Sequence, residues 1–338
     1  PDCAFGGNYM SECLISRHGG KYRVGKLIFG NNLSVIQNDL AEIWSNNNYS
    51  NGRQIVTDNN DVYVLCIEPT GAIHKLSGVD GSEIWSKNGG HYIAIDKDNI
   101  YMSISYPTYD AQGTMSGWVI RIIKLSGVDG SQIWTKDTGG SFIAADSSGD
   151  VYASLVNSGI CKLSGVDGSQ IWYYGNGEWN QRLATDSNND VYLSSLERSY
   201  SSPIRKLSGV DGTVIWTNSD VGSNGSITTD DANNVYVLSN SVKRVRKLSG
   251  VDGSEIWNSR FGFASDDSNI AIDNNKKCLY ISNNAGYLLK LSSEDGTEMN
   301  AKFAGDIYDV ATDNTGVYIV GNTTIKKLST NPIYKIIS

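Results

Sequence analysis

Apolar residues in this chain come in short runs that alternate with clusters of Gly, Asn, Asp and Ser. Residues 53–86, for example, contain the runs RQIVT, VYVLCI, AIHKL and SEIWS. Runs of this length that are rich in Val, Ile, Tyr and Trp are typical of β-strands. The residues between them favour tight hairpins, because Asn, Asp and Gly tolerate positive φ. No segment has a convincing helical period, so the pattern predicts an all-β protein of short antiparallel strands.

These four runs belong to a unit that recurs about every 40 residues, which is the signature of a repeat architecture. The phrase KLSGVDGSEIW starts at residue 75 and returns almost unchanged at residues 124, 162, 206 and 247. A degraded copy, KLSSEDGTEM, starts at residue 290, and a stub, KLST, starts at residue 327. The lysines that open the seven copies are Lys75, Lys124, Lys162, Lys206, Lys247, Lys290 and Lys327.

A second phrase, of the type VTDNNDVYV, precedes each copy of the first. Its aspartates are Asp58, Asp96, Asp146, Asp186, Asp230, Asp273 and Asp313. Its tyrosines are Tyr63, Tyr101, Tyr152, Tyr192, Tyr236, Tyr280 and Tyr318. We interpret the Asp as the start of an Asx turn rather than as a calcium ligand, because the Gly and the distal Glu of an EF-hand loop are missing. The repeated Lys can pair with an Asp, and we expect such a pair to be exposed and to contribute about 0–1 kcal/mol.

Four antiparallel strands, A to D, repeated seven times predict a seven-bladed β-propeller of four-stranded antiparallel blades. Tryptophan recurs in strand D, where each side chain can bury about 150–250 Å² against a neighbouring blade. These tryptophans are Trp44, Trp85, Trp134, Trp172, Trp216 and Trp257. The first of them precedes any A–B–C set, so residues 40–45 are predicted to form the outer strand of the last blade and close the ring. The alternative is an eight-bladed ring in which residues 12–44 form the extra blade.

The segments outside the repeat are expected to have other roles. Residues 1–39 are predicted to be an N-terminal attachment segment with a hairpin around HGG, and residues 40–330 to be the propeller. Residues 331–338 are predicted to be a C-terminal tail, and the degraded copy at 327–338 is either part of it or a competing edge strand. Because the chain starts with Pro rather than Met, we expect a processed chain or a piece of a longer one.

Charge and cysteine usage narrow the choice of partners and compartments. The net charge of −8 argues against nucleic acid or an anionic membrane surface as the main partner. No apolar run approaches the roughly 18 residues of a membrane span, so membrane insertion is not expected. Cys66, Cys161 and Cys278 fall on predicted strands and are interpreted as small buried apolar residues. Cys3 and Cys13 flank a Gly-rich segment and either pair in an oxidising compartment or stay free.

The eleven-residue phrase resembles the tryptophan-docking motif of the quinoprotein (PQQ-like) propeller repeats, which reads Ala-x-Asp-x-x-Thr-Gly-Lys-x-x-Trp. The Gly and the Trp match in all five full copies, as in Gly81 and Trp85. The departures from the family pattern are Lys75 for Ala, Ser77 for Asp, Asp80 for Thr and Ser82 for Lys. The resemblance implies the blade and its Trp packing over about 290 residues. The family includes dehydrogenases that hold a quinone and a calcium ion near the axis, and also non-enzymatic scaffolds, so the fold does not decide the function.

Signals of catalysis are weak, and we predict neither an enzyme nor a cofactor or metal site. The three histidines form no HExxH pattern, and His74 is interpreted as a structural or surface residue. No GxSxG, P-loop or haem motif is present, and no adjacent cysteine pair. A hydrolase or lyase would need carboxylates clustered near the axis, and the candidates are Asp110, Glu178 and Glu197.

The two faces of the predicted propeller differ in how strictly they repeat. The A–B and C–D links share one face, and the phrase Lys is always ten residues before the phrase Trp in the five full copies. The B–C links, on the other face, vary from nine residues between Tyr318 and Lys327 to twenty-three between Tyr101 and Lys124. Individual loops on a rigid frame are where binding usually resides. Aromatic residues in or near these links are the candidate ligand contacts: Tyr106, Tyr109, Trp118, Tyr173, Tyr174, Trp179 and Tyr200. The alternative is that these rings only pack the loops down.

The sequence therefore predicts a non-catalytic structural and recognition module that binds a surface glycan or a protein through its variable face. An extracellular or virion-surface setting, such as a phage fibre, a decoration protein or an adhesin, is favoured by the Asn, Ser, Gly and Tyr content. A periplasmic or outer-membrane assembly scaffold that binds protein partners is the alternative, and a quinone-dependent dehydrogenase is the third hypothesis.

Overall fold

The computed structural model describes the backbone of residues 16–18, 21–23, 34–38 and 333–337, and most of residues 40–330. Within the last range the residues not described are 59, 68–70, 111, 139, 156–158, 176, 178–180, 196–202, 221–224, 240–242 and 262–267. The chain divides into two compact units, one of residues 42–330 and the other of residues 1–41 with 331–338.

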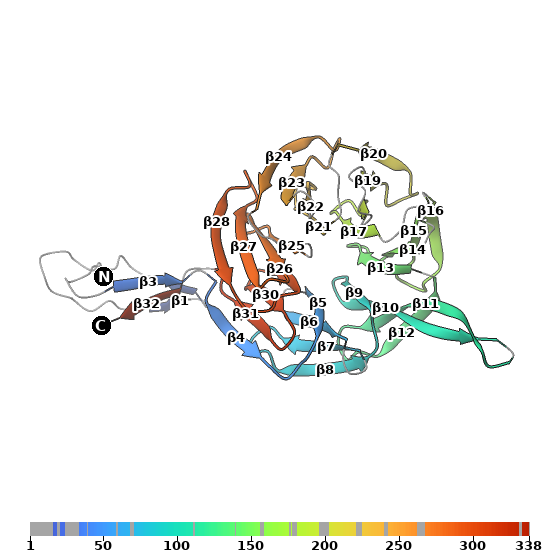
Figure 1. The fold of residues 1–338 in the computed structure, drawn as a ribbon, viewed down its shortest axis with the longest axis horizontal. Coiled ribbons are helices and arrows are strands. Elements are labelled where there is room, and N and C mark those ends of the chain that lie inside the picture. Colours follow the sequence, from blue (N-terminus) through green and yellow to red (C-terminus); the bar gives the residue numbers. More distant parts are fainter. Residues whose placement is uncertain are drawn as a thin grey trace, which may run out of the picture. The chain divides into compact units, whose positions relative to one another are not determined.

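The larger unit is a ring of seven four-stranded antiparallel sheets, numbered here as blades 1 to 7 and seen end-on in Figure 1. From the inner to the outer strand, blade 1 is β5 (Gly52–Thr57), β6 (Asp61–Cys66), β7 (Ala72–Ser77) and β8 (Glu83–Asn88). Blade 2 is β9 (Tyr92–Ile95), β10 (Asn99–Tyr109), β11 (Met115–Ser126) and β12 (Gln132–Asp137). Blade 3 is β13 (Gly140–Ala145), β14 (Val151–Leu155), β15 (Gly159–Leu163) and β16 (Gln170–Tyr174). Blade 4 is β17 (Gln181–Thr185), β18 (Val191–Ser195), β19 (Ile204–Leu207) and β20 (Val214–Asn218).

The remaining blades follow the same order. Blade 5 is β21 (Ile227–Thr229), β22 (Val235–Ser239), β23 (Arg244–Leu248) and β24 (Glu255–Arg260). Blade 6 is β25 (Ser268–Asp273), β26 (Cys278–Asn283), β27 (Tyr287–Ser292) and β28 (Glu298–Phe303). Blade 7 is β29 (Asp309–Thr312), β30 (Val317–Val320), β31 (Ile325–Leu328) and β4 (Glu42–Asn46). Each inner strand contacts the inner strands of both neighbouring blades, so seven strands surround the axis. The prediction of a seven-bladed propeller is confirmed, and the eight-bladed alternative is wrong.

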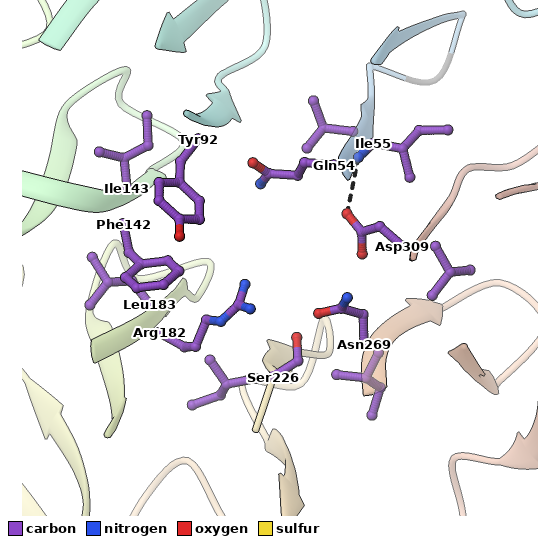
Figure 2. Close-up of a pocket in the computed structure, with 14 residues that line it drawn as sticks. Gln54, Ile55, Tyr92, Phe142, Ile143, Arg182, Leu183, Ser226, Asn269 and Asp309 are labelled. Carbon is purple, nitrogen blue, oxygen red and sulfur yellow. Dashed lines mark hydrogen bonds between the residues drawn. The ribbon is translucent and has the colours of Figure 1, made fainter. Parts of the chain in front are cut away.

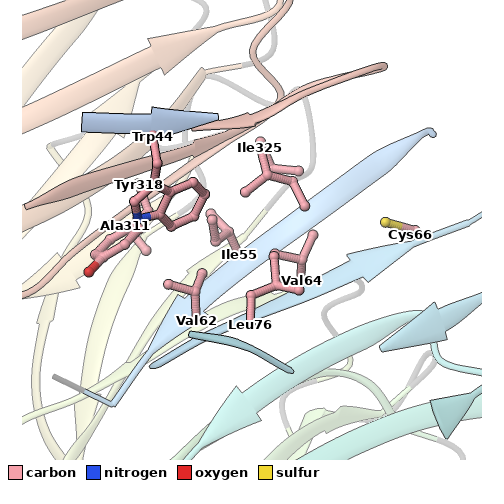
Figure 3. Packing of buried hydrophobic residues seen from close by; sticks show 10 residues of the cluster. Trp44, Ile55, Val62, Val64, Cys66, Leu76, Ala311, Tyr318 and Ile325 are labelled. Atoms are coloured by element: carbon pink, nitrogen blue, oxygen red, sulfur yellow. The ribbon is translucent and has the colours of Figure 1, made fainter. Parts of the chain in front are cut away.

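Blade 7 joins the two ends of the ring. Strand β4, which comes first in the sequence of the ring, pairs with β31 in the register that the other blades use, with Trp44 opposite Lys327. Its residues overlap the segment 40–45 that the sequence assigns to closure. The Trp44 side chain lies among buried residues of both blade 7 and blade 1, including Tyr318 and Ile55 (Figure 3). The ring is therefore closed by backbone pairing within blade 7 and by apolar packing between blades 7 and 1.

Every blade has an irregularity at one place in strand C. The register of the C–D pair shifts directly after the phrase Lys, as between Lys75 and Leu76. The shift leaves Lys75 directly opposite Trp85, and it does the same for the corresponding residues of the other blades except blade 6, where Lys290 faces Asn300. A one-residue bulge of this kind re-aims side chains, and here it puts Lys and Trp in position for a common contact.

That contact is made with the next blade, as the sequence predicted for Trp. The indole Nε1 of Trp134 and the Nζ of Lys124 both donate to the carbonyl oxygen of Gly165, at 3.1 Å and 2.8 Å. The ring of Trp134 also lies against Gly168, where φ is +73° and an added Cβ would come within 3.0 Å of the ring. The glycine of the phrase is needed both for its backbone conformation and for the space that the Trp of the preceding blade fills.

The repeated Asp, Tyr and Lys form one hydrogen-bonded cluster in each of blades 3 and 4. In blade 3, Lys162 Nζ lies 3.0 Å from Asp146 and 3.1 Å from Asp150, and the hydroxyl of Tyr152 donates to Asp146 at 3.1 Å. The Asx turn is confirmed, because Asp146 Oδ1 accepts hydrogen bonds from the backbone of Ser148 and Asp150. The expectation that the ion pair would be exposed is wrong. The side chains of Lys162 and Asp146 are 7% and 0% exposed, since the neighbouring blade covers them.

The smaller unit contains two strand pairs. Strands β1 (Ser16–His18) and β2 (Lys21–Arg23) form a short antiparallel pair. Strand β3 (Ser34–Asn38) pairs with β32 (Ile333–Ile337), so the last described segment of the chain is not an edge strand of the ring. The expectation that residues 327–338 act as one tail or edge strand is corrected: Lys327 belongs to blade 7, and residues 333–337 pair in the smaller unit.

Candidate functional site

The propeller has one end that repeats and one end that varies. At the repeating end the A–B and C–D links of a blade meet, because the backbone N–H of Gly78 donates to the carbonyl of Asn60 and Gly127 donates likewise to Asp98. The inner strands run from the opposite end toward these links. The first residues of each inner strand therefore surround the axis at the variable end, where the D–A and B–C links emerge.

Aligning the seven inner strands on the phrase Asp shows a position that differs in every blade. Four residues before that Asp, the ring contains Gln54, Tyr92, Phe142, Arg182, Ser226, Asn269 and Asp309. We call these seven residues the axial ring. One residue further on, every blade has an aliphatic side chain: Ile55, Ile93, Ile143, Leu183, Ile227, Ile270 and Val310. Successive residues of a strand point to opposite faces, so the aliphatic position packs between blades while the axial ring is free to differ.

The axial ring lines a cavity of about 220 Å³. All seven of its members contribute, together with neighbouring inner-strand residues such as Ile55 and Leu183. Figure 2 shows the aromatic and cationic side chains on one side of the cavity and the amide and carboxylate side chains on the other. The cavity therefore has a polar interior of mixed charge rather than an apolar one.

Two amides of the axial ring are held by the backbone. Gln54 accepts a hydrogen bond from the N–H of Ile93 and donates one to its carbonyl, both at 2.8 Å, so it joins blades 1 and 2. The amide nitrogen of Asn269 donates to the carbonyl of Tyr308 at 2.6 Å and joins blades 6 and 7. Both polar atoms of the Gln54 amide are used in these hydrogen bonds to Ile93. Asn269 uses only its amide nitrogen, in the hydrogen bond to Tyr308.

Three consecutive blades supply an aromatic and cationic wall. The rings of Tyr92 and Phe142 lie with their centroids 4.2 Å apart. The guanidinium of Arg182 lies 4.8 Å from the centroid of Phe142, within the range of a cation–π contact. Its Nε is buried and has no hydrogen-bond partner among the described residues. Arg182 is thus positioned by packing and not by an acceptor.

Asp309 supplies the negative charge of the cavity. Its Oδ2 accepts a hydrogen bond from the backbone N–H of Ile55 at 3.0 Å, which is the dashed line in Figure 2. Burial raises the pKa of this carboxyl to about 6, although the backbone hydrogen bonds and Arg182 act in the opposite direction. The Asp309 side chain is partly accessible to solvent, because it lines the cavity.

The candidate contacts from the loops lie elsewhere. Tyr106 and Tyr109 are on β10 and Trp118 is on β11, so the long B–C insertion of blade 2 is a regular hairpin and not an irregular loop. It extends away from the ring at the right of Figure 1. Tyr109 and Trp118 are 62% and 61% exposed, whereas the ring of Tyr106 lies under the guanidinium of Arg121 at 5.2 Å. Asp110, one of the three acids considered for catalysis, caps the hairpin turn by accepting from backbone N–H groups.

The other candidate contacts belong to blade 3 or fall outside the described residues. Tyr173 and Tyr174 are on β16, the outer strand, where Tyr173 is half exposed and Tyr174 packs against the core of blades 3 and 4. Trp179 and Tyr200 lie outside the described residues, as do Glu178, Glu197, Cys3 and Cys13. None of the five described aromatic candidates lines the axial cavity, so they stay predictions for a separate contact.

The described residues offer no evident metal site. They contain no group of three or more His, Cys, Asp or Glu side chains that would suit a metal ion. A calcium ion with a quinone does not fit the axial cavity, because Asp309 is its only carboxylate and Arg182 adds a positive charge. His74 Nδ1 lies 2.8 Å from Glu83 and its ring lies against Tyr49, which agrees with a structural role.

The cysteines of the strands agree with the sequence interpretation. Cys66, Cys161 and Cys278 are buried and form no disulfide with a described residue, and burial raises the pKa of the Cys161 thiol to about 12. In the part of the chain that the structure describes, no helix is both long and apolar enough to cross a membrane.

Sequence reasoning missed the axial ring although the sequence contains its signal. Loop length and aromatic residues pointed to the links between strands as the binding site, and not to the inner strands. The position four before the phrase Asp is visible once the units are aligned on that Asp, because it alternates among amide, aromatic, cationic, hydroxyl and acidic side chains within one chain. Variation at a position inside a repeating strand indicates that the position faces something other than the repeated core.

Comparisons with known proteins identify the fold but no family. No family model matches the chain, and no curated protein sequence matches it. Among solved structures, BamB from Moraxella catarrhalis superimposes with a TM-score of 0.59 at 14% identity, over 86% of this chain and 99% of that one. The computationally designed Ika8 protein superimposes with a TM-score of 0.61 at 13% identity, over the same shares of the two chains. Likeness at this level of identity supports the propeller fold alone, and the relation to quinoprotein repeats stays a prediction.

Proposed function

We propose that this chain is a non-catalytic recognition module that binds a protein partner or a surface glycan through the variable end of the propeller. The propeller fold fits an interaction or scaffold role. The observation that carries the proposal is the contrast between the two ends of the blades. One end repeats the same Asp, Tyr and Lys in every blade and the same Trp in six of the seven, while the axial ring at the other end has a different side chain in every blade.

The hairpin of β10 and β11 supports the same conclusion. It places Tyr109 and Trp118 in solvent, together with Met115 at 49% exposure. Tyr and Trp give large contact areas at low cost in side-chain entropy, which is why they dominate the centres of binding surfaces. Both features lie on blade ends that the template does not constrain, because the hairpin is the B–C link of blade 2.

The setting and the attachment of the module form part of the proposal. We infer an extracellular or virion-surface location from the Asn, Ser, Gly and Tyr content. Residues 1–39 are proposed to attach the propeller to a partner or to a further segment, since they belong to a compact unit separate from the ring. The blades are proposed to be related to the quinoprotein-type repeat through their Gly and Trp pairs.

The test is binding of the purified protein to a broad glycan array and to intact bacterial cells. Trp118→Ala and Tyr109→Ala remove exposed rings of the hairpin, and Val166→Ala serves as the matched control because Val166 is 86% exposed at the repeating end. Loss of a ring that contacts the ligand is worth about 1.4 kcal/mol or more, so we expect at least a tenfold loss of affinity in either hairpin variant. The control variant is expected to bind like the parent.

Two results would contradict the proposal. One is that the folded protein binds no glycan, cell surface or cell-derived protein. The other is that Val166→Ala weakens binding as much as Trp118→Ala, which would move the contact to the repeating end. Trp179→Ala, in the D–A link of blade 3, tests the remaining predicted tryptophan in the same assay.

A further inference from the structure

The axial cavity contains a cation and an anion that do not neutralise each other. Arg182 is on blade 4 and Asp309 is on blade 7, so they reach the cavity from nearly opposite sides of the ring (Figure 2). They influence each other electrostatically, yet no ion pair within 4.0 Å joins them among the described residues. Paired charges are the rule for groups with limited access to water, so this separation is unusual.

The guanidinium of Arg182 is oriented for an acceptor that the protein does not provide. Its face lies on Phe142, its Nε is buried without a partner, and no oxygen of the described residues accepts from it. A guanidinium held in this way presents parallel N–H groups, which match the two oxygens of a carboxylate. The missing acceptor is therefore best supplied by a carboxylate.

The opposite wall is suited to an ammonium group. Asp309 accepts from the backbone of Ile55 through Oδ2, and no cationic side chain among the described residues lies within ion-pair distance of it. Asn269 donates its amide nitrogen to Tyr308, which leaves its carbonyl oxygen as an acceptor on the same side. A carboxylate with a neighbouring amide oxygen fits the three N–H donors of an ammonium.

Size and apolar surface narrow the class further. A volume of about 220 Å³ is below the range of pockets that hold drug-sized ligands, so the cavity suits a small molecule. Tyr92 and Phe142 provide an aromatic surface beside Arg182, on the wall that faces Asp309 (Figure 2). The cavity thus fits a small molecule with two opposite charges and an apolar part.

We propose that the axial cavity binds a free α-amino acid with an uncharged side chain, its carboxylate on Arg182 and its ammonium on Asp309 and Asn269. This inference extends the proposed recognition function to a small ligand at the same end of the propeller. The amino acid side chain lies against Tyr92 and Phe142 in this arrangement.

The experiment is titration calorimetry of the full chain with the neutral L-amino acids, supported by thermal-shift measurement. Each amino acid is compared with the amine that lacks its carboxylate and with the acid that lacks its amino group. Arg182→Gln and Asp309→Asn remove one charge each, and both substitutions keep hydrogen-bonding capacity. Arg260→Gln is the matched control, because Arg260 is an exposed arginine on β24, the outer strand of blade 5, and does not line the cavity.

We expect at least one neutral amino acid to bind, with at least tenfold weaker binding of its amine and acid analogues. Arg182→Gln and Asp309→Asn are each expected to lower the affinity at least tenfold, and Arg260→Gln is expected to leave it unchanged. The inference is overturned if no amino acid binds to the folded protein, or if the acid analogue binds as well as the amino acid. Glucuronate is included as an acidic sugar, and binding that exceeds that of every amino acid would also overturn it.

Failure of this inference can be told apart from failure of the proposed function. If amino acids do not bind while glycan or cell binding still depends on Trp118, the recognition function stands and only the ligand assignment is lost. If neither assay detects binding by the folded protein, both are rejected.

Discussion

Removal of the lysine amine at the centre of blade 3 should destabilise the propeller far more than the same change in blade 2. Lys162 Nζ contacts Asp146 at 3.0 Å, Asp150 at 3.1 Å and the carbonyl of Gly209 at 2.9 Å. Met has nearly the same length and volume but no charge. Lys162→Met therefore keeps the packing and leaves two carboxylates without their cation, one of them fully buried.

The expected magnitude follows from the burial of the pair. Removing one partner of a buried ion pair costs about 3–5 kcal/mol, because the remaining charge is left uncompensated. In blade 2 the corresponding lysine is Lys124, whose Nζ lies 3.6 Å from a carboxylate oxygen of Asp96. Asn99 takes the place of the second aspartate, and its amide nitrogen donates to Asp96 at 3.2 Å. Lys124→Met therefore leaves one carboxylate without its cation instead of two, and we expect its loss of unfolding free energy to be at least about 1.5 kcal/mol smaller.

The assay is urea unfolding at pH 7, followed by tryptophan fluorescence and circular dichroism, with the thermal midpoint as a second measurement. At about 2 °C per kcal/mol for a chain of this size, Lys162→Met should lower the midpoint by about 6–10 °C. The double variant Asp150→Asn/Lys162→Met reproduces the blade 2 arrangement and should recover part of the loss. Equal losses for Lys162→Met and Lys124→Met, or no recovery in the double variant, would refute the view that these charges depend on each other.

Three further predictions follow from single positions. Gly168→Ala should lower the free energy of unfolding, measured in urea, by about 2–4 kcal/mol, because φ is +73° and the new Cβ would meet the ring of Trp134. Gly113→Ala is the control: φ is +79° but the space around the new Cβ is open, so the loss should be only about 1–2 kcal/mol. The folded-state pKa of Asp309, about 6, lies above its ordinary value of 3.8, so its carboxylate lowers stability as pH rises through this interval. Asp309→Asn should therefore be more stable than the parent by up to about 3 kcal/mol at pH 8 and equal to it near pH 4, and a constant difference across this range would contradict the assignment. The Cys161 thiol, with a pKa of about 12, should resist iodoacetamide at pH 8 until the protein unfolds, as read by peptide mass spectrometry, and labelling of the native protein would show that blade 3 opens.

The fold was predictable from the sequence because one structural unit recurs seven times along the chain. The Gly and Trp of the five full phrases, the seven repeated Asp and Tyr residues and the early strand that ends near Trp44 were sufficient to predict the number of blades. The burial of Lys162 with Asp146 was not predictable, because a single blade leaves this pair at its surface and only the next blade covers it. Burial between repeats depends on their stacking, which a unit considered alone does not specify.

The candidate site was harder to predict from the sequence than the fold, for a related reason. Loop length marked the hairpin of β10 and β11 as unusual, but its regular pairing up to Thr108 and Gly117 could not be read from a segment rich in turn-forming residues. The axial ring was hidden because its members, such as Arg182 and Asp309, look ordinary within their own strands. They become a site only because seven strands bring them to one axis.

Closure of the ring through β4 also sets the order of events during synthesis. Strand β4 leaves the ribosome long before its partner β31, since Asn46 pairs with Ile325 roughly 280 residues later. At about 5–20 residues per second, the interval between them is on the order of 15–60 seconds. During that time β4 has no partner in the ring and blade 1 lacks the Trp44 contact on Gly81, so an open sheet edge is available to other chains. Among the strand pairs of the ring this closing pair is thus the most non-local one, and yield during expression should depend on how well this early strand is kept from pairing elsewhere until the rest of blade 7 is made.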